Sequence, residues 1–108
     1  MRVAIIDLGT NSVRFDVHHI GSKSQFRLLH REKLMVRLGQ GVFSEGKLNA
    51  EAIRRTVQAF ESFRKTADEF RVDRIVAFGT AALREAADGA RLLAAIREKS
   101  GIEIRVIS

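Results

Sequence analysis

The sequence predicts an α/β fold built on one mixed β-sheet, with the element order β-β-β-α-β-α-β. Three observations predict it: three strand-like segments joined by short loops come first, a long amphipathic segment follows, and strand-like and helical segments then alternate. The chain has 108 residues, of which 45% are hydrophobic and 30% charged. This length and composition fit a single domain around one core.

The first three strands are expected at Arg2–Leu8, Ser12–Ile20 and Gln25–Val36. Arg2–Leu8 is almost continuously apolar, which is typical of a central strand buried on both faces. Ser12–Ile20 alternates apolar and polar residues, and a turn at Gly21–Ser24 leads into the third strand, which we expect to be interrupted and near an edge. Because the loops are short, the three strands should form an antiparallel meander.

The long amphipathic segment is expected to be a helix from Ala50 to Phe70, with Asn49 as its N-cap and Glu51 in its first turn. Its apolar residues recur at the spacing of one helix face. They are Ile53, Val57, Phe60, Phe63, Ala67 and Phe70. We expect this stripe to pack in the core and not to form a ligand groove.

Strands and helices alternate in the last third of the chain. Strands are expected at Arg74–Gly79 and Ile102–Val106. Between them, Thr80–Ala87 is expected to be helical, and a second helix at Asp88–Lys99 is expected to use Asp88 as its cap. Gly101 follows as the residue that ends this helix.

A meander followed by right-handed crossovers places the first strand in the centre of the sheet, in the strand order 3-2-1-4-5. This order is the RNase H-like layout. In open α/β sheets, ligands bind at the carboxyl ends of the strands. The loops after Leu8 and after Phe78, on the first and fourth strands, are therefore the best candidates to carry chemistry.

Composition excludes several classes of function. The chain has no cysteine, so disulfide scaffolds, cysteine-ligated zinc and thiol redox chemistry are excluded. Its apolar runs are too short for a membrane span or a signal peptide, so we expect a cytoplasmic domain without a membrane partner. The formal net charge is +6, with 14 Arg against 5 Lys. Guanidinium groups bind phosphate oxygens in a planar fork, so this balance suits a polyanionic partner, although solubility alone also explains it.

The first candidate loop follows the central strand and contains Asp7, Gly9, Thr10, Asn11 and Ser12. Glycine at position 9 can adopt a positive φ and allows close approach of a ligand to the backbone. Successive N–H groups and the side chains of the next three residues can bind an anion. The carboxylate of Asp7 can hold a hydrated Mg²⁺. A plain hairpin turn remains the alternative interpretation.

The second candidate loop follows the fourth strand. Thr80 occupies an N-cap position, so free N–H groups of a helix start would face the crevice. Arg84 lies one helical turn further on the same face. A hydroxyl, a positive helix end and an arginine together suit a phosphoryl group. The alternative is an ordinary surface pair of Arg84 with Asp88.

Other motifs carry less chemistry. Gly39 and Gly41 form a G-x-G, but the third glycine and the strand-to-helix turn of a dinucleotide fingerprint are missing. His18 and His19 should face opposite sides of their strand, and His30 lies on another, so we do not expect these histidines to bind a metal.

Four segments resemble the exopolyphosphatase and guanosine pentaphosphate phosphatase (Ppx/GppA) family of the actin-like superfamily, in the family's order and spacing. They are AIIDLGTNSVR at 4–14, VRLGQGVFSEGKLNAEAIRRT at 36–56, FGTAALREA at 78–86 and IEIRVIS at 102–108. The resemblance implies that the DLGTNS turn is a first phosphate-binding loop and that Arg84 contacts phosphate. It also implies hydrolysis of polyphosphate or guanosine pentaphosphate with Mg²⁺ or another divalent cation.

In that family, a G-x-E-E-A segment with the general base follows the strand that matches 102–108, and a DxGGGS phosphate loop comes later. The resemblance therefore implies that residues 1–108 form a single N-terminal lobe that stops before both, and that the isolated chain is inactive.

Three further expectations remain. A non-catalytic RNase H-like module that binds polyanions or nucleic acid is the alternative function, although nucleic acid is the less favoured partner because Tyr and Trp are absent. A two-metal nuclease is rejected, because Gly79-Thr80 stands where a second carboxylate would be needed. Finally, an exposed apolar side of Ile102, Ile104 and Val106 is expected to favour self-association into a homo-oligomer.

Overall fold

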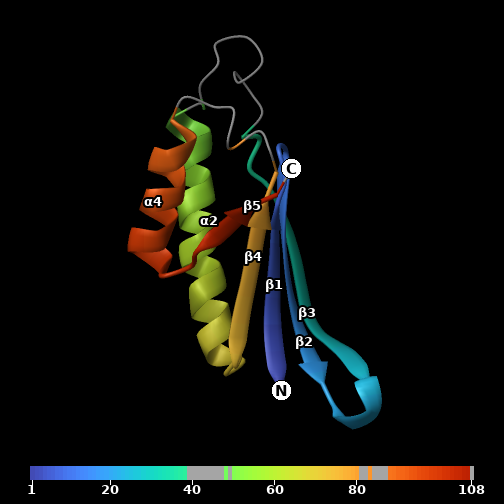
Figure 1. Ribbon diagram of the computed structural model, residues 1–108. Coiled ribbons are helices and arrows are strands. Elements are labelled where there is room, and N and C mark those ends of the chain that lie inside the picture. Colours follow the sequence, from blue (N-terminus) through green and yellow to red (C-terminus); the bar gives the residue numbers. More distant parts are fainter. Residues whose placement is uncertain (39–47, 49, 81–82, 84–87, 108) are drawn as a thin grey trace.

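One mixed sheet of five strands forms the centre of the structure, a computed structural model that describes residues 1–38, 48, 50–80, 83 and 88–107 (Figure 1). The strands are β1 (Arg2–Leu8), β2 (Ser12–Ile20), β3 (Phe26–Met35), β4 (Arg74–Gly79) and β5 (Ile104–Val106). Their order is β3-β2-β1-β4-β5, as predicted. β1 is antiparallel to β2 and parallel to β4, and these pairings leave it in the centre of the sheet.

The first three strands form the predicted meander. A short 3-10 turn, η1 (Ser22–Ser24), joins β2 to β3. β3 lies at the edge of the sheet, and its pairing with β2 shifts register between Val17 and His18. This register shift corresponds to the interruption that the sequence predicts for the third strand. An irregularity of this kind bends the strand, and at the edge of a sheet it disrupts few hydrogen bonds.

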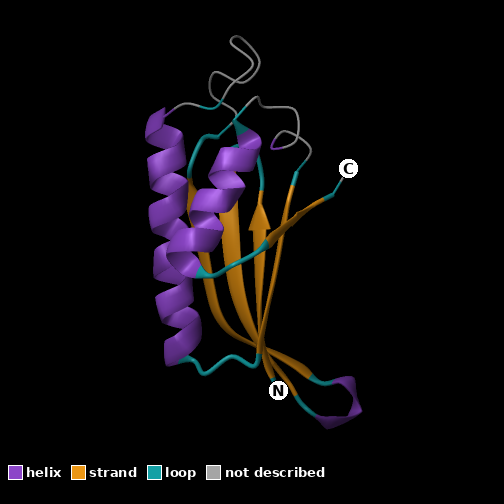
Figure 2. Ribbon diagram, turned by 60° about the vertical axis from the view of Figure 1, so that its left-hand side comes forward, coloured by secondary structure: helices purple, strands orange, loops and turns teal. Residues whose placement is uncertain are grey.

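Two helices, α2 (Ala50–Glu69) and α4 (Gly89–Ser100), lie on the same face of the sheet (Figures 1 and 2). Gly101 ends α4 as predicted, with φ of 72° and its N–H donated to the Arg97 carbonyl at 2.9 Å. The predicted Asn49 cap, and residues 81–82 and 84–87 of the predicted helical stretch, lie outside the described residues. No helix of the described part has an apolar stretch long enough to cross a bilayer.

The core lies between the helices and the sheet. Side chains of β1 and β2 that point toward α2 are completely buried, and they alternate with residues on the opposite face. They are Ala4, Ile6, Leu8, Val13, Phe15 and Val17. The ring of Phe15 stacks on that of Phe63 with 4.7 Å between centroids, and Phe60 meets Phe63 edge to face at 5.6 Å. The contacts among these three aromatic rings hold α2 against β2.

The buried face of α2 is rotated from the predicted apolar stripe. Ala52, Thr56 and Ala59 are buried, whereas Ile53 and Val57 are only partly buried. The Thr56 hydroxyl donates to the Ala52 carbonyl at 2.7 Å, so this polar side chain can lie inside the core without an unpaired group. The buried face of the first turns of α2 is therefore made of small residues, which hydrophobicity alone did not predict.

The predicted capping role of Asp88 is wrong. Asp88 occupies the N-cap position of α4, but its side chain makes no capping hydrogen bond. Its carboxylate instead accepts the Leu48 N–H at 2.9 Å, and its backbone carbonyl accepts the Leu92 N–H at 3.2 Å. A tertiary partner has replaced the local one, so Asp88 ties the residues before α2 to the start of α4.

The prediction for the last strand also needs correction. β5 has only three residues, and Ile102 is a buried core residue at 3% exposure instead of a strand residue. Ile104 and Val106 are partly buried against the same core. The apolar side that was expected to be exposed therefore packs against the core.

Asp16 on β2 has 6% exposure and lies on the face of the sheet opposite the helices. Arg31 donates two hydrogen bonds to its carboxylate, at 2.9 and 3.0 Å. These bonds lower the pKa of Asp16, and the nearby charges of Arg31, Arg14 and His18 lower it further, while burial opposes them.

Because the pKa of Asp16 is lower in the folded than in the unfolded protein, the ionised carboxylate stabilises the fold at pH values above the ordinary carboxyl pKa of about 4. This contribution is lost as the pH falls through the folded-state pKa. We therefore expect wild-type protein to lose more free energy of unfolding than Asp16→Asn does between pH 6 and pH 3. Urea unfolding at both pH values measures the difference. Equal losses in the two proteins would contradict the role of this carboxylate.

Candidate functional site

The loop after β1 is a tight turn held by its own backbone. The Gly9 N–H donates to the Ser12 carbonyl at 2.9 Å, which closes the turn between β1 and β2. A Cβ on Gly9 would lie 3.2 Å from that same carbonyl oxygen, so close approach favours glycine here. The positive φ considered for Gly9 is not found, because Gly101 is the glycine with a positive φ among the described residues.

The tip of this turn is fastened to the end of β3. The carbonyl of Asn11 accepts the N–H groups of Val36 at 2.9 Å and of Arg37 at 2.8 Å. Asn11 itself is exposed, while Thr10 and Ser12 are half-buried. The backbone of the loop is therefore fixed by hydrogen bonds, and the Asn11 side chain lies at the surface of the turn.

The loop after β4 lies directly beside the loop after β1. The Thr80 N–H donates to the Leu8 carbonyl at 3.2 Å, and the Thr80 carbonyl accepts the Leu83 N–H at 3.2 Å. The Thr80 hydroxyl is buried and has no hydrogen-bond partner in the described part of the chain. Most buried hydroxyls are paired, so this one is a candidate to bind a ligand. Arg84, the other residue predicted here, lies outside the described residues.

Asp7 projects from β1 on the face opposite the helices, because its neighbours Ile6 and Leu8 are buried under them. It is half-buried, and its cross-strand neighbours are Arg14 on β2 and Phe78 on β4. Asp7 is the last residue but one of β1, and Thr80 directly follows β4. Both residues therefore lie at the carboxyl ends of two adjacent parallel strands, at the same edge of the sheet.

The donors at this edge fit a magnesium ion that keeps most of its waters. Asp7 offers one carboxylate and Thr80 one hydroxyl. Among the residues described, no three His, Asp or Glu side chains gather into a metal-binding group. Mg²⁺ is commonly held by one or two protein carboxylates, water and substrate phosphate, so a single carboxylate suits this ion better than it suits zinc.

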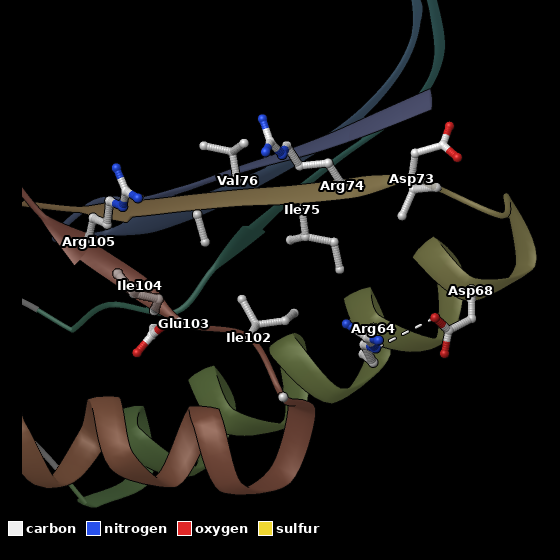
Figure 3. Close-up of a pocket in the computed structure, with 13 residues that line it drawn as sticks. Arg64, Asp68, Asp73, Arg74, Ile75, Val76, Ile102, Glu103, Ile104 and Arg105 are labelled. Carbon is white, nitrogen blue, oxygen red and sulfur yellow. Dashed lines mark ion pairs between the residues drawn. The ribbon is translucent and has the colours of Figure 1, made fainter. Parts of the chain in front are cut away.

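The face of the sheet that carries Asp7 is rich in cations. Strand pairing places five basic residues on it, with Asp7 and Asp16 as the acidic residues of the five strands there. The basic residues are Arg14, Arg31, Lys33, Arg74 and Arg105. In Figure 3, Arg74 and Arg105 point away from the helices, on the same side of the sheet as Val76. The alternation of the strands therefore places five of the chain's 19 basic residues on this face, and two of them, Arg14 and Arg31, lie beside the Asp16 carboxylate.

A cavity of about 770 Å³ lies away from the two loops, between the first half of β4 and the segment that joins α4 to β5 (Figure 3). It opens where β5 diverges, because β5 pairs with β4 only from Ala77 to Gly79. Arg64 and Asp68 of α2 form an ion pair at its floor, with 3.5 Å between nitrogen and oxygen. Neither Asp7 nor Thr80 lines it, so this hollow is separate from the predicted crevice.

Sequence reasoning missed one residue beside the candidate loops. Arg55 of α2 donates two hydrogen bonds to the Val36 carbonyl, at 3.0 and 3.3 Å. Val36 is the residue whose N–H binds Asn11. No sequence signal singled out Arg55, because an arginine four residues after Glu51 is an ordinary pair on a helix face.

The strand order, with two helices on one face of the sheet, defines an RNase H-like fold. Residues 16–108 match the Ppx/GppA phosphatase family, and the chain belongs to this family.

Exopolyphosphatase 2 of Mycobacterium tuberculosis is 37% identical over 87 residues, which are 78% of this chain and 27% of that protein. A crystal structure of the Aquifex aeolicus family member has a TM-score of 0.95 and 32% identity, over 99% of this chain and 35% of that one. An exopolyphosphatase structure from Cytophaga hutchinsonii has a TM-score of 0.92 and 31% identity, over 99% and 34% of the two chains. This chain thus spans between a quarter and about a third of these relatives.

Proposed function

We propose that this chain is the first phosphate-binding lobe of a phosphoanhydride hydrolase that acts on inorganic polyphosphate or guanosine pentaphosphate. The observation that carries the proposal is the hydrogen bond from the Thr80 N–H to the Leu8 carbonyl at 3.2 Å, because it brings the two candidate loops together at one edge of the sheet. Membership of the Ppx/GppA phosphatase family supports the reaction class. Relatives described as exopolyphosphatases favour polyphosphate as the substrate.

In this proposal, the residues of the lobe bind and orient the terminal phosphoryl group. The turn from Gly9 to Ser12 supplies polar donors, and the Thr80 hydroxyl, which has no partner among the described residues, donates from the neighbouring loop. Arg84 adds a guanidinium, as the family resemblance implies. Donors fixed in advance stabilise the charge of the transition state without having to reorganise.

Asp7 is proposed to hold Mg²⁺ through water at the end of β1. A bound Mg²⁺ neutralises negative charge on the phosphate oxygens. The Asp7 side chain that would hold the metal lies on the side of the sheet away from the helices. Hydrolysis also needs an activated water, and we place the base that activates it in the portion of the relatives that this chain does not span.

Asn11→Ala tests the proposed loop, because it removes an exposed amide and keeps the backbone hydrogen bonds to Val36 and Arg37. We expect the variant to bind tripolyphosphate about tenfold more weakly in titration calorimetry with Mg²⁺, which is the usual cost of losing a hydrogen bond to a charged group. Gln25→Ala is the matched control, since it removes an exposed amide near η1 at the other end of β2.

A second function, non-catalytic binding of polyanions, is favoured by the five basic residues on the open face of the sheet. The same titration distinguishes the two functions. Diffuse binding should fall steeply with salt and ignore Asn11→Ala. If wild-type protein binds no tripolyphosphate, or if Asn11→Ala binds it as wild type does, the proposed loop is wrong.

A further inference from the structure

We propose that Arg55 is a positioning residue that holds the Gly9–Ser12 loop in the arrangement that binds phosphate. The inference rests on the proposed function, since it assigns a task to a residue that touches the loop only through other residues. Arg55 lies on α2, in a different layer from the loop. Two consecutive hydrogen-bonded links join them.

The first link joins α2 to the end of β3. Nη2 of Arg55 donates to the Val36 carbonyl at 3.0 Å, and Nε donates to the same oxygen at 3.3 Å. The second link joins this segment to the loop, because the N–H groups of Val36 and Arg37 donate to the Asn11 carbonyl at 2.9 and 2.8 Å. The Val36 residue is therefore held at both its N–H and its carbonyl.

The segment at Val36 needs such support for two reasons. Val36 has 2% exposure, so water cannot readily replace a lost donor at its carbonyl. Arg37, the next residue, has a φ of 55°, in the left-handed region that residues with a side chain rarely adopt. A strained backbone of this kind persists only where its surroundings hold it.

Helix pairing accounts for only part of the contacts of Arg55. Arg55 lies in the second turn of α2, four residues after Glu51, where the two side chains can pair on one helix face. Glu51 lies 3.8 Å from its guanidinium, but the neighbouring Arg54 already pairs with that carboxylate by a two-pronged hydrogen bond. The reach of Arg55 to the Val36 carbonyl is the contact that distinguishes these two adjacent arginines.

Loss of the Arg55 donors should therefore loosen the Val36 and Arg37 backbone and, through the Asn11 carbonyl, the loop. If only about a tenth of the molecules then keep the binding arrangement, the apparent Kd for phosphate rises about tenfold. The positive charge of Arg55 does not enter this argument, because the guanidinium acts on a backbone carbonyl and not on the ligand.

The test compares Arg55→Met with Arg54→Met in the 108-residue chain. Both variants remove one positive charge and keep an unbranched side chain suited to a helix. We expect Arg55→Met to bind tripolyphosphate about tenfold more weakly than wild type, and Arg54→Met to stay within twofold. Arg55→Lys, which offers one ammonium group in place of a two-nitrogen fork, should give an intermediate affinity.

Hydrogen exchange distinguishes a local positioning role of Arg55 from a general contribution to the stability of the fold. In Arg55→Met, the amides of Val36 and Arg37 should exchange faster, while the amide of Ile6 in the centre of the sheet keeps its wild-type rate. A general loss of stability would instead speed exchange at all three positions. Should Arg55→Met fail to fold, Arg55→Lys decides the question by the same two measurements.

The outcomes separate this inference from the proposed function. If Asn11→Ala weakens binding and Arg55→Met leaves both affinity and amide exchange unchanged, Arg55 has no positioning role and the proposed loop stands. If neither variant changes the affinity, the proposed loop itself fails. If Arg54→Met weakens binding as much as Arg55→Met does, the effect is one of charge, and the positioning role is overturned.

Discussion

Phe63→Ala is expected to lower the free energy of unfolding by about 3–5 kcal/mol, the usual cost of removing a large aromatic side chain from a core. Phe63 is completely buried on α2 and contacts two other rings, with centroid distances of 4.7 Å to Phe15 and 5.6 Å to Phe60. Neither neighbour can fill the space without breaking the contact between helix and sheet. Urea unfolding followed by circular dichroism measures the loss.

Phe26→Ala is the matched control for this prediction. Phe26 begins β3 at the edge of the sheet and is 69% exposed, so its removal should change the free energy of unfolding by less than about 1 kcal/mol. Because small domains are stable by about 5–15 kcal/mol, the loss expected for Phe63→Ala is a large fraction of the total stability. A loss below about 1 kcal/mol in Phe63→Ala would contradict the placement of this ring in the core.

Gly89→Ala is the second substitution with a large expected effect. A Cβ on Gly89, the first residue of α4, would lie 1.7 Å from the backbone carbonyl oxygen of Leu83. A backbone atom cannot rotate away as a side chain can, so either α4 or the backbone of Leu83 must move. We expect a loss of about 3 kcal/mol or more, at the upper end of single-residue effects.

Gly101→Ala provides the comparison for Gly89→Ala. Gly101 has a φ of 72°, and a Cβ there would meet nothing within 4 Å. Only the backbone conformation opposes this substitution, which costs about 1–2 kcal/mol. Thermal unfolding of the two variants ranks them, and a smaller loss in Gly89→Ala than in Gly101→Ala would show that the contact with Leu83 does not constrain the fold.

Gly89 also connects stability to the candidate site. Leu83, which it contacts, donates its N–H to the Thr80 carbonyl at 3.2 Å. A shift of Leu83 should therefore change the setting of the unpaired Thr80 hydroxyl. Gly89→Ala is expected to alter tripolyphosphate binding as well as stability, whereas Phe63→Ala acts on the core, at a distance from the two loops.

Some parts of the fold followed from local patterns. β1, β2 and β4 have the predicted bounds, because their apolar residues are bounded by glycine or turn residues and no other element competes for them. The order of the sheet followed from short connections and right-handed crossovers. The loops after β1 and β4 could be chosen as candidates because adjacent parallel strands end at the same edge of a sheet.

Other features were not predictable because their partners are distant in the sequence. Asp88 was expected to cap its own helix, yet it accepts a hydrogen bond from Leu48, 40 residues earlier. Arg55 reaches Val36 across 19 residues. In both cases the observed partner lies on another element, and folding brings it within hydrogen-bond distance.

The bounds of β1, β2 and β4, the strand order and the segments that carry the family resemblance could be read from the amino-acid sequence, because periodicity, glycine placement and short loops act between near neighbours. Only the tertiary structure decided which donors serve which acceptors, such as Arg31 for Asp16 and Arg55 for Val36. It also placed five basic residues on one face and left the buried Thr80 hydroxyl without a partner among the described residues. Each of these depends on distances between elements, and packing of the core sets those distances.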